Sequence, residues 1–167
     1  MTAGRRFERT TCQLLLAAVQ LVVASAFAQD ATFTQRNLTP ETALKAAQAA
    51  LAHCRKDGFQ VAVAVVDRSG TTQVLLRDRF AGPHTIDFAA NKAWTAVSTR
   101  LDTSEIEKAP QRNVISNTRW LAIAGGVTIE AGGSLLGAIG VSGAPGGAAD
   151  EVCAKAGLRA IADSLEF

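Results

Sequence analysis

The sequence predicts a single α+β domain with helices packed on a mainly antiparallel sheet. Its length of 167 residues and mass of 17.4 kDa allow one domain and exclude a multidomain enzyme. Its hydrophobic content of 48% and charged content of 19% supply a core and exclude a disordered chain. The predicted elements run helix, two strands, helix, two or three strands, helix, without the long β-α-β crossovers that parallel strands require.

Residues 1–28 have the pattern of a secretory signal peptide. Arg5, Arg6 and Arg9 give a positive start, residues 12–27 are almost wholly apolar, and Ala26-Phe27-Ala28 is a small-x-small cleavage site. The alternative is a membrane anchor, but an uncharged run of about 18 residues is at the short end for spanning a bilayer. We therefore expect cleavage and a periplasmic or secreted protein. The sequence leaves export by the general or the twin-arginine route open.

The charge of the chain lies in this first segment. Without it, 14 basic and 14 acidic side chains remain, so the body of the protein is neutral. A neutral body without a Lys/Arg cluster argues against nucleic-acid binding and, after signal cleavage, against membrane binding.

We expect residues 29–37 to be a flexible N-terminal segment and residues 38–167 to form the domain. Thr39 is a predicted N-cap with Pro40 at the first helical position. An apolar stripe at spacings of three and four follows, and Gly58 ends the helix. The stripe consists of Leu44, Ala47, Leu51 and Cys54.

A strand over 60–66 has no polar interruption after Gln60, which places it in the centre of the sheet. Residues 67–70 form a turn, and residues 72–77 return as the second strand of a hairpin. Gly82-Pro83 breaks the chain, and a second helix is predicted over 85–100.

Residues 102–118 are polar and contain a single predicted helical turn near 104–108. Further elements are predicted as a short strand over 120–123, a hairpin over 127–130 and 135–141, and a last helix over 150–165. The glycine-rich stretch at 143–147 has two interpretations. It is a plain turn, or its backbone N–H groups receive an anion such as a carboxylate.

Two cysteines remain once the signal segment is removed. Cys54 lies near the end of the first helix and Cys153 near the start of the last. If these helices pack antiparallel on one sheet face, the two positions come level, and an oxidising compartment favours a disulfide. The alternative is a pair of buried free thiols.

The sequence assigns no catalytic residue and leaves enzyme activity undecided. The chain has two histidines, His53 and His84, no tyrosine, and Met1 as its single methionine, so few side chains are strong ligands for haem iron. His53 lies one residue off the apolar stripe and is expected at the surface. His84 follows Gly82-Pro83 at the mouth of the second helix, where a solvated or capping role is the ordinary one.

Several segments resemble the GlcG/HbpS-like haem-binding proteins. The strongest runs from Gly125-Gly126-Val127 through Gly137-Ala138-Ile139-Gly140-Val141-Ser142-Gly143. Others are Val63–Asp67 with Ser69-Gly70, Asn91–Ala96, Asp150-Glu151 and Ala156-Gly157-Leu158. The resemblance covers about residues 38–165.

This resemblance implies a profilin-like fold with a five-stranded antiparallel sheet and helices on both faces, and it implies a homo-oligomer. Together with the predicted signal peptide, the resemblance leads to the expectation of an exported protein that binds haem non-covalently for haem or iron buffering or redox sensing. The alternatives are a haem-degrading or small-hydroxy-acid enzyme of the same family, and an accessory module that docks on a periplasmic dehydrogenase or sensor.

The family also suggests which residues would contact haem. Thr95 aligns with a threonine proposed to contact the iron, and the alternative is a helix-face hydroxyl bonded to a backbone carbonyl. His84 is an iron-ligand candidate from a second subunit, because about 16 Å of helix separates it from Thr95. Propionates would be neutralised by Lys92 and Arg77, and the porphyrin would be flanked by Phe88 and Trp94.

Overall fold

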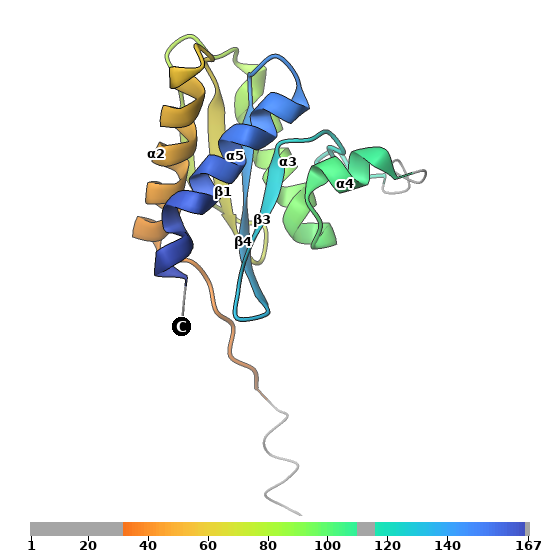
Figure 1. Cartoon of the computed structure of the whole chain (residues 1–167). Coiled ribbons are helices and arrows are strands. Elements are labelled where there is room, and N and C mark those ends of the chain that lie inside the picture. Colours follow the sequence, from red (N-terminus) through yellow and green to blue (C-terminus); the bar gives the residue numbers. More distant parts are fainter. Residues whose placement is uncertain (1–31, 110–115, 166–167) are drawn as a thin grey trace, which may run out of the picture. The chain divides into compact units, whose positions relative to one another are not determined.

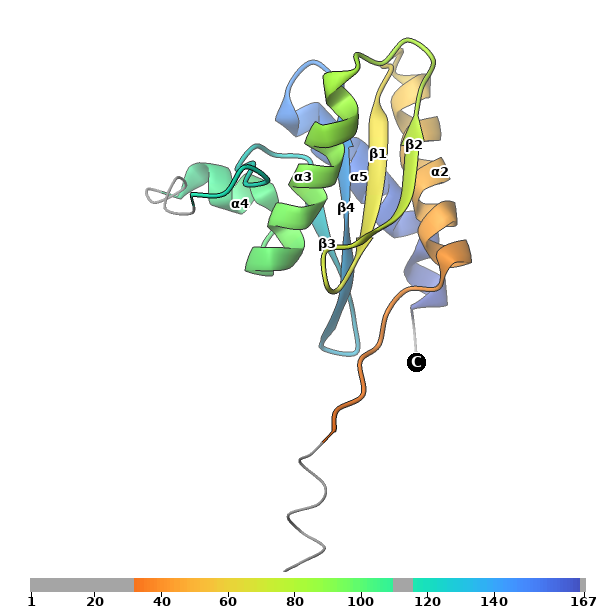
Figure 2. The same cartoon turned by 180° about the vertical axis from the view of Figure 1, so that it is seen from behind.

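The computed structural model describes residues 32–109 and 116–165. The predicted signal peptide lies outside these residues. The elements are α2 (Pro40–Lys56), β1 (Ala62–Asp67), β2 (Thr72–Arg77), α3 (His84–Thr99), α4 (Thr103–Lys108), β3 (Gly126–Ala131), β4 (Ser134–Ser142), α5 (Gly147–Ile161) and the 3₁₀ helix η2 (Ala162–Ser164). The predicted α+β class is confirmed, with helices on both faces of an antiparallel sheet (Figures 1 and 2).

The sheet of the described chain has four strands in the order β2-β1-β4-β3, all antiparallel. β1 lies inside it, as its uninterrupted apolar run predicts. The prediction of five strands was wrong, and residues 120–123 form no strand. The physical reason is that backbone N–H groups in this segment and directly after it donate to side chains instead of to a neighbouring strand. Leu121 donates to Thr95 Oγ1 and Ala124 donates to Glu107 Oε2.

α2 and α5 cover one face of the sheet (Figure 1). Thr39 caps α2 by accepting a hydrogen bond from Thr42 N, as predicted. The core between these helices and the sheet combines alanine side chains, most of them from α2, with large aliphatic side chains from the strands, including Val63, Ile129 and Ile139. Cys54 of α2 and Cys153 of α5 are both buried and form a disulfide, so the predicted pairing is confirmed and the free-thiol alternative is excluded.

α3 covers the opposite face (Figure 2). The contact there is made by small side chains such as Ala89, Ala93 and Ala138. A Cβ added at Gly140 of β4 would lie 2.1 Å from the carbonyl oxygen of Ala89. Glycine at that position therefore lets the helix backbone lie directly against the strand.

Among the described helices, none is long and apolar enough to cross a membrane.

Candidate functional site

The middle of α3 carries a buried ion pair. Lys92 Nζ donates to Asp150 Oδ2 of α5 over 2.6 Å, and the two side chains are 3% and 5% exposed. Burial raises the pKa of Asp150, while Lys92 and the backbone N–H of Ala144 act to lower it. The glycine-rich stretch at 143–147 thus does receive a carboxylate, and that carboxylate is the chain's own Asp150. In this arrangement the Lys92 ammonium is enclosed and paired.

Thr95 lies one turn further along α3 and is fully buried. Its hydroxyl accepts from Leu121 N over 3.0 Å and lies 3.5 Å from the carbonyl oxygen of Arg119. Thr95 is therefore found in the alternative role, as a hydroxyl on the helix face that bonds to neighbouring backbone groups. Contact between Thr95 and haem iron stays a prediction, and it requires the segment around residues 119–121 to move.

Trp94 is half-buried near the far end of α3 from His84. The Arg119 guanidinium lies 5.0 Å from the centre of its ring. The indole also contacts Gly70, where an added Cβ would lie 2.8 Å from Trp94 Cδ1. Trp94 therefore packs on the turn between β1 and β2 and is separated along the helix from His84.

The start of α3 is exposed and aromatic. His84 is exposed, and its ring makes an edge-on contact with Phe88, with 5.5 Å between ring centres. Phe88 is 41% exposed. The structure thus brings together these two predicted residues and leaves the imidazole accessible to a ligand.

Basic side chains flank the β2–α3 connection, residues 78–83. Arg77 donates from Nε and Nη2 to the carbonyl oxygen of Ala81, which fixes the path of the connection. The Arg79 guanidinium lies 6.0 Å from the centre of the Phe80 ring, and Phe80 is 78% exposed. Arg77, His84 and Phe88 therefore share one region, whereas Lys92, Trp94 and Thr95 are engaged elsewhere. The six predicted ligand contacts do not form a single site in one subunit.

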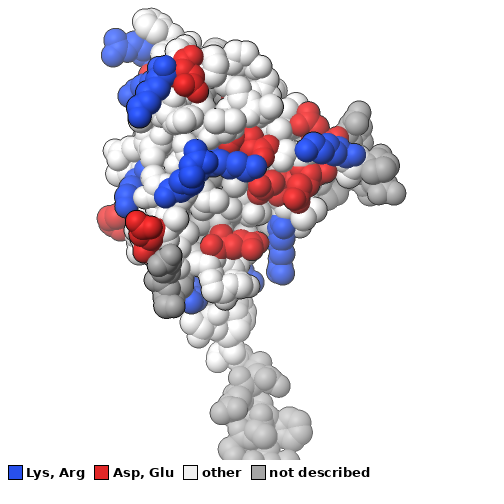
Figure 3. Space-filling model, in the orientation of Figure 1, with Lys and Arg blue, Asp and Glu red and all other residues white. Residues whose placement is uncertain are grey.

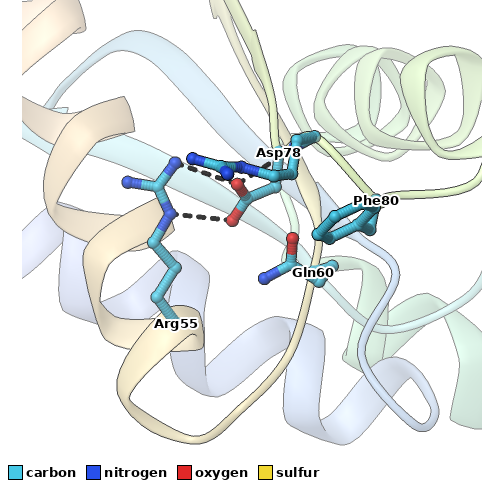
Figure 4. A pocket seen from close by; sticks show the side chains of 5 residues that line it. Arg55, Gln60, Asp78 and Phe80 are labelled. Atoms are coloured by element: carbon cyan, nitrogen blue, oxygen red, sulfur yellow. Dashed lines mark hydrogen bonds and ion pairs between the residues drawn. The ribbon is translucent and has the colours of Figure 1, made fainter.

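A pocket beside the connection was not predicted from the sequence (Figure 4). Its walls include a bidentate pair in which Arg55 donates from Nε and Nη2 to Asp78 over 2.8 and 2.9 Å. These hydrogen bonds lower the pKa of Asp78, whose side chain is 4% exposed. An acid placed directly after the strand at 72–77 was the available signal, but its partner lies 23 positions earlier in α2.

The charges on the face that carries α2 and α5 are of both signs and intermixed (Figure 3). This pattern agrees with the neutral composition of the body. The described residues include no group of three or more His, Cys, Asp or Glu side chains that could hold a metal ion.

Comparison with known proteins gives a consistent result. Residues 38–159 match the family model described as haem degrading protein HbpS-like. A double mutant of HbpS from Streptomyces reticuli is 45% identical, with a TM-score of 0.73 over 78% of this chain and 90% of that one. PduOC, solved as a complex with haem, is 26% identical, with a TM-score of 0.68 over 75% of this chain and 95% of that one.

A curated relative from Citrobacter freundii is described as an uncharacterized 15.0 kDa protein in the dhaT-dhaS intergenic region. It is 33% identical over 113 residues, which are 64% of this chain and 80% of that protein. Since the family model spans the whole sheet and the helices on both of its faces, the chain belongs to the HbpS-like family.

Proposed function

We propose that this protein binds haem non-covalently at the start of α3, with His84 as the iron ligand. The observation that carries the proposal is the exposed His84 imidazole beside the ring of Phe88. An imidazole supplies a strong ligand to haem iron, and the exposed ring of Phe88 offers apolar surface to a porphyrin edge. Arg77, whose guanidinium has five N–H donors of which two are used, is available to a propionate.

The other strong iron ligands are few. Cys54 and Cys153 are joined to each other, the chain has no tyrosine, and Met1 and Cys12 lie outside the described residues. His53 is the second histidine, and its Nε2 lies 3.8 Å from Asp57 in the last turn of α2. Unlike His84, it has no contact with an aromatic ring among the described residues. His84 is therefore the side chain best suited to the iron.

The relatives support the ligand. PduOC was solved with haem, and HbpS gives its name to a family described as haem degrading. We further propose that the protein is exported, works as a homo-oligomer, and serves haem or iron buffering or redox sensing. A homo-oligomer suits an exposed His84, because a second subunit would supply the remaining wall of a haem site and a further iron contact.

A titration of hemin into the purified protein tests the proposal. We expect a saturable shift of the Soret band, and we expect His84→Ala to weaken binding by about tenfold or more. The matched control is His53→Ala, which removes the other imidazole and should leave affinity within about twofold. Equal affinities for these two variants would exclude His84 as the ligand.

The family description favours haem degradation as a second candidate function. Its readout is loss of the Soret band with time when a reductant and oxygen are added to the hemin complex. A stable band under those conditions would leave binding without degradation. A protein that shows no hemin shift at any concentration would instead be the accessory docking module or the small-hydroxy-acid enzyme.

A further inference from the structure

The pocket between the end of α2 and the β2–α3 connection has the features of an anion site. It has a volume of about 400 Å³ and is lined by Arg55, Gln60, Asp78, Arg79 and Phe80 (Figure 4). We propose that it binds a small hydroxylated aromatic carboxylate. Neither His84 nor Phe88 lines this pocket, and the proposal does not depend on haem binding.

The charge of the pocket favours an anion. Two guanidinium groups face one carboxylate, so the net formal charge of the lining is +1. Asp78 is buried and already neutralised by the bidentate pair with Arg55. The positive charge of Arg79 also lowers the pKa of Asp78, while its guanidinium lies 6.0 Å from the centre of the Phe80 ring. Arg79 therefore offers the excess positive charge.

Arg55 retains hydrogen-bonding capacity beyond its pair with Asp78. A guanidinium has five N–H donors, and the pair with Asp78 uses two of them. The Arg55 side chain is 54% exposed, so its remaining donors are open to a ligand. A carboxylate suits this arrangement, because its two oxygens accept from parallel N–H groups of a guanidinium held in one orientation.

Gln60 supplies the second recognition element. Its Oε1 is buried and has no hydrogen-bond partner within the described part of the chain. A buried acceptor without a donor costs free energy, and a ligand hydroxyl would satisfy it. The close-up shows this oxygen on the side of Gln60 nearest Asp78, with the Phe80 ring beside it (Figure 4). The ligand thus needs a hydroxyl in addition to its carboxylate.

Phe80 explains the aromatic part of the proposal. It is 78% exposed at the rim of the pocket, with the cationic group of Arg79 near its ring. A ligand ring placed against Phe80 and Arg79 would cover apolar surface and gain a stacking contact with the guanidinium.

The test uses three probes in calorimetric titrations of the purified protein: 3-hydroxybenzoate, benzoate and the uncharged 3-hydroxybenzyl alcohol. We expect 3-hydroxybenzoate to bind about fivefold or more tightly than benzoate, and the alcohol to show no measurable binding. Arg79→Ala should weaken both acids by about tenfold. Gln60→Leu should lower the affinity for 3-hydroxybenzoate to that for benzoate, because it removes the acceptor for the hydroxyl.

The control variant is Arg159→Ala, which removes an exposed arginine on α5 and should leave the affinities unchanged. Thermal unfolding of each variant tests whether the fold is retained, and Arg55 is left intact because its loss would leave the buried Asp78 carboxylate without its bidentate cation. The proposal is overturned by equal affinities for the three probes, or by an Arg79→Ala variant that binds like the wild type. Competition between hemin and 3-hydroxybenzoate would also overturn it and assign the pocket to a haem propionate. His84→Ala must leave 3-hydroxybenzoate binding unchanged.

Discussion

The two faces of the sheet are held by different forces. The face under α2 and α5 is a conventional core of Val, Ile and Leu side chains closed by a disulfide. The face under α3 is packed largely through alanine and glycine, with Val66, Val97 and Leu135 also buried there, and its buried polar groups include Lys92 and Thr95. Alanine and glycine bury little apolar area per residue. The position of α3 on the sheet therefore depends more on hydrogen bonds and on the Lys92–Asp150 pair.

This difference bears on where function lies. Lys92, Thr95 and Thr103 hold α3 and the segments that cover it, with Thr103 Oγ1 accepting from Gly126 N. The start of α3, by contrast, leaves His84 and Phe88 exposed. One helix therefore has a structural middle and a surface end available to ligands. The following measurements test how strongly each face depends on its own kind of contact.

Loss of the buried ion pair should have the largest effect. Lys92→Met leaves the Asp150 carboxyl buried without its cation, and we expect the free energy of unfolding to fall by about 3–5 kcal/mol. Urea unfolding measures the change. The control is Lys45→Met on the exposed side of α2, where the change should stay within about 0.5 kcal/mol. Lys92→Met combined with Asp150→Asn should recover part of the loss. Similar free energies of unfolding for Lys92→Met and the control Lys45→Met would show that the ion pair does not hold α3.

Removal of the disulfide should follow in size. The bond closes a loop with a sequence separation of 99. Cys54→Ala with Cys153→Ala should cost about 2–4 kcal/mol, chiefly because the unfolded chain gains freedom. The melting temperature of wild type with and without reductant gives an independent reading. Detection of titratable thiols from these two residues in denatured, unreduced protein would contradict the assignment.

Glycines on the two faces can be compared directly. At Gly140 an added Cβ meets backbone of α3, and Gly140→Ala should cost about 1–3 kcal/mol through overpacking. At Gly157 of α5 the added Cβ also meets close atoms, 2.6 Å from the Ala46 carbonyl oxygen. That variant gains about 1 kcal/mol of helix propensity, so its net loss should be smaller. Chemical denaturation measures the free energy of unfolding of both variants. A larger loss of stability for Gly157→Ala than for Gly140→Ala would contradict the prediction.

The pH dependence of the Arg55–Asp78 pair should be the smallest effect. Hydrogen bonds from Arg55 hold the pKa of Asp78 below its ordinary value of 3.8. The unfolded chain therefore binds a proton at higher pH than the folded one, and the stabilisation is full above that value and lost as pH falls through the folded pKa. We expect the stability of Asp78→Asn to decline less steeply below about pH 4 than that of wild type. Parallel curves of stability against pH for the two proteins would show that the Arg55–Asp78 pair does not contribute to the pH dependence.

Local patterns predicted most of the fold. Thr39-Pro40 placed the start of α2, and the uninterrupted run after Gln60 placed β1 inside the sheet. The error at residues 120–123 has a clear source, because those residues have strand-like composition but Leu121 N–H donates to Thr95 and the N–H of the adjacent Ala124 donates to Glu107. A profilin-like classification stays a prediction.

The candidate site was less accessible from sequence. His84 and Phe88 lie one helical turn apart, so their contact follows from local spacing. Lys92 and Asp150 are 58 positions apart, and nothing in either segment indicates that they meet. Arg55 and Asp78 present the same difficulty, since an ion pair between elements depends on packing that the sequence pattern does not specify.

The cystine that joins α2 and α5 also turns residues 54–153 into a covalent ring. A protease that cuts once anywhere inside that ring leaves both pieces attached. A force applied at the two ends of the protein extends only the chain outside the ring, until the sulfur bridge bears the load. The sheet and α3 lie wholly inside, shielded from tension that their own contacts would otherwise have to resist.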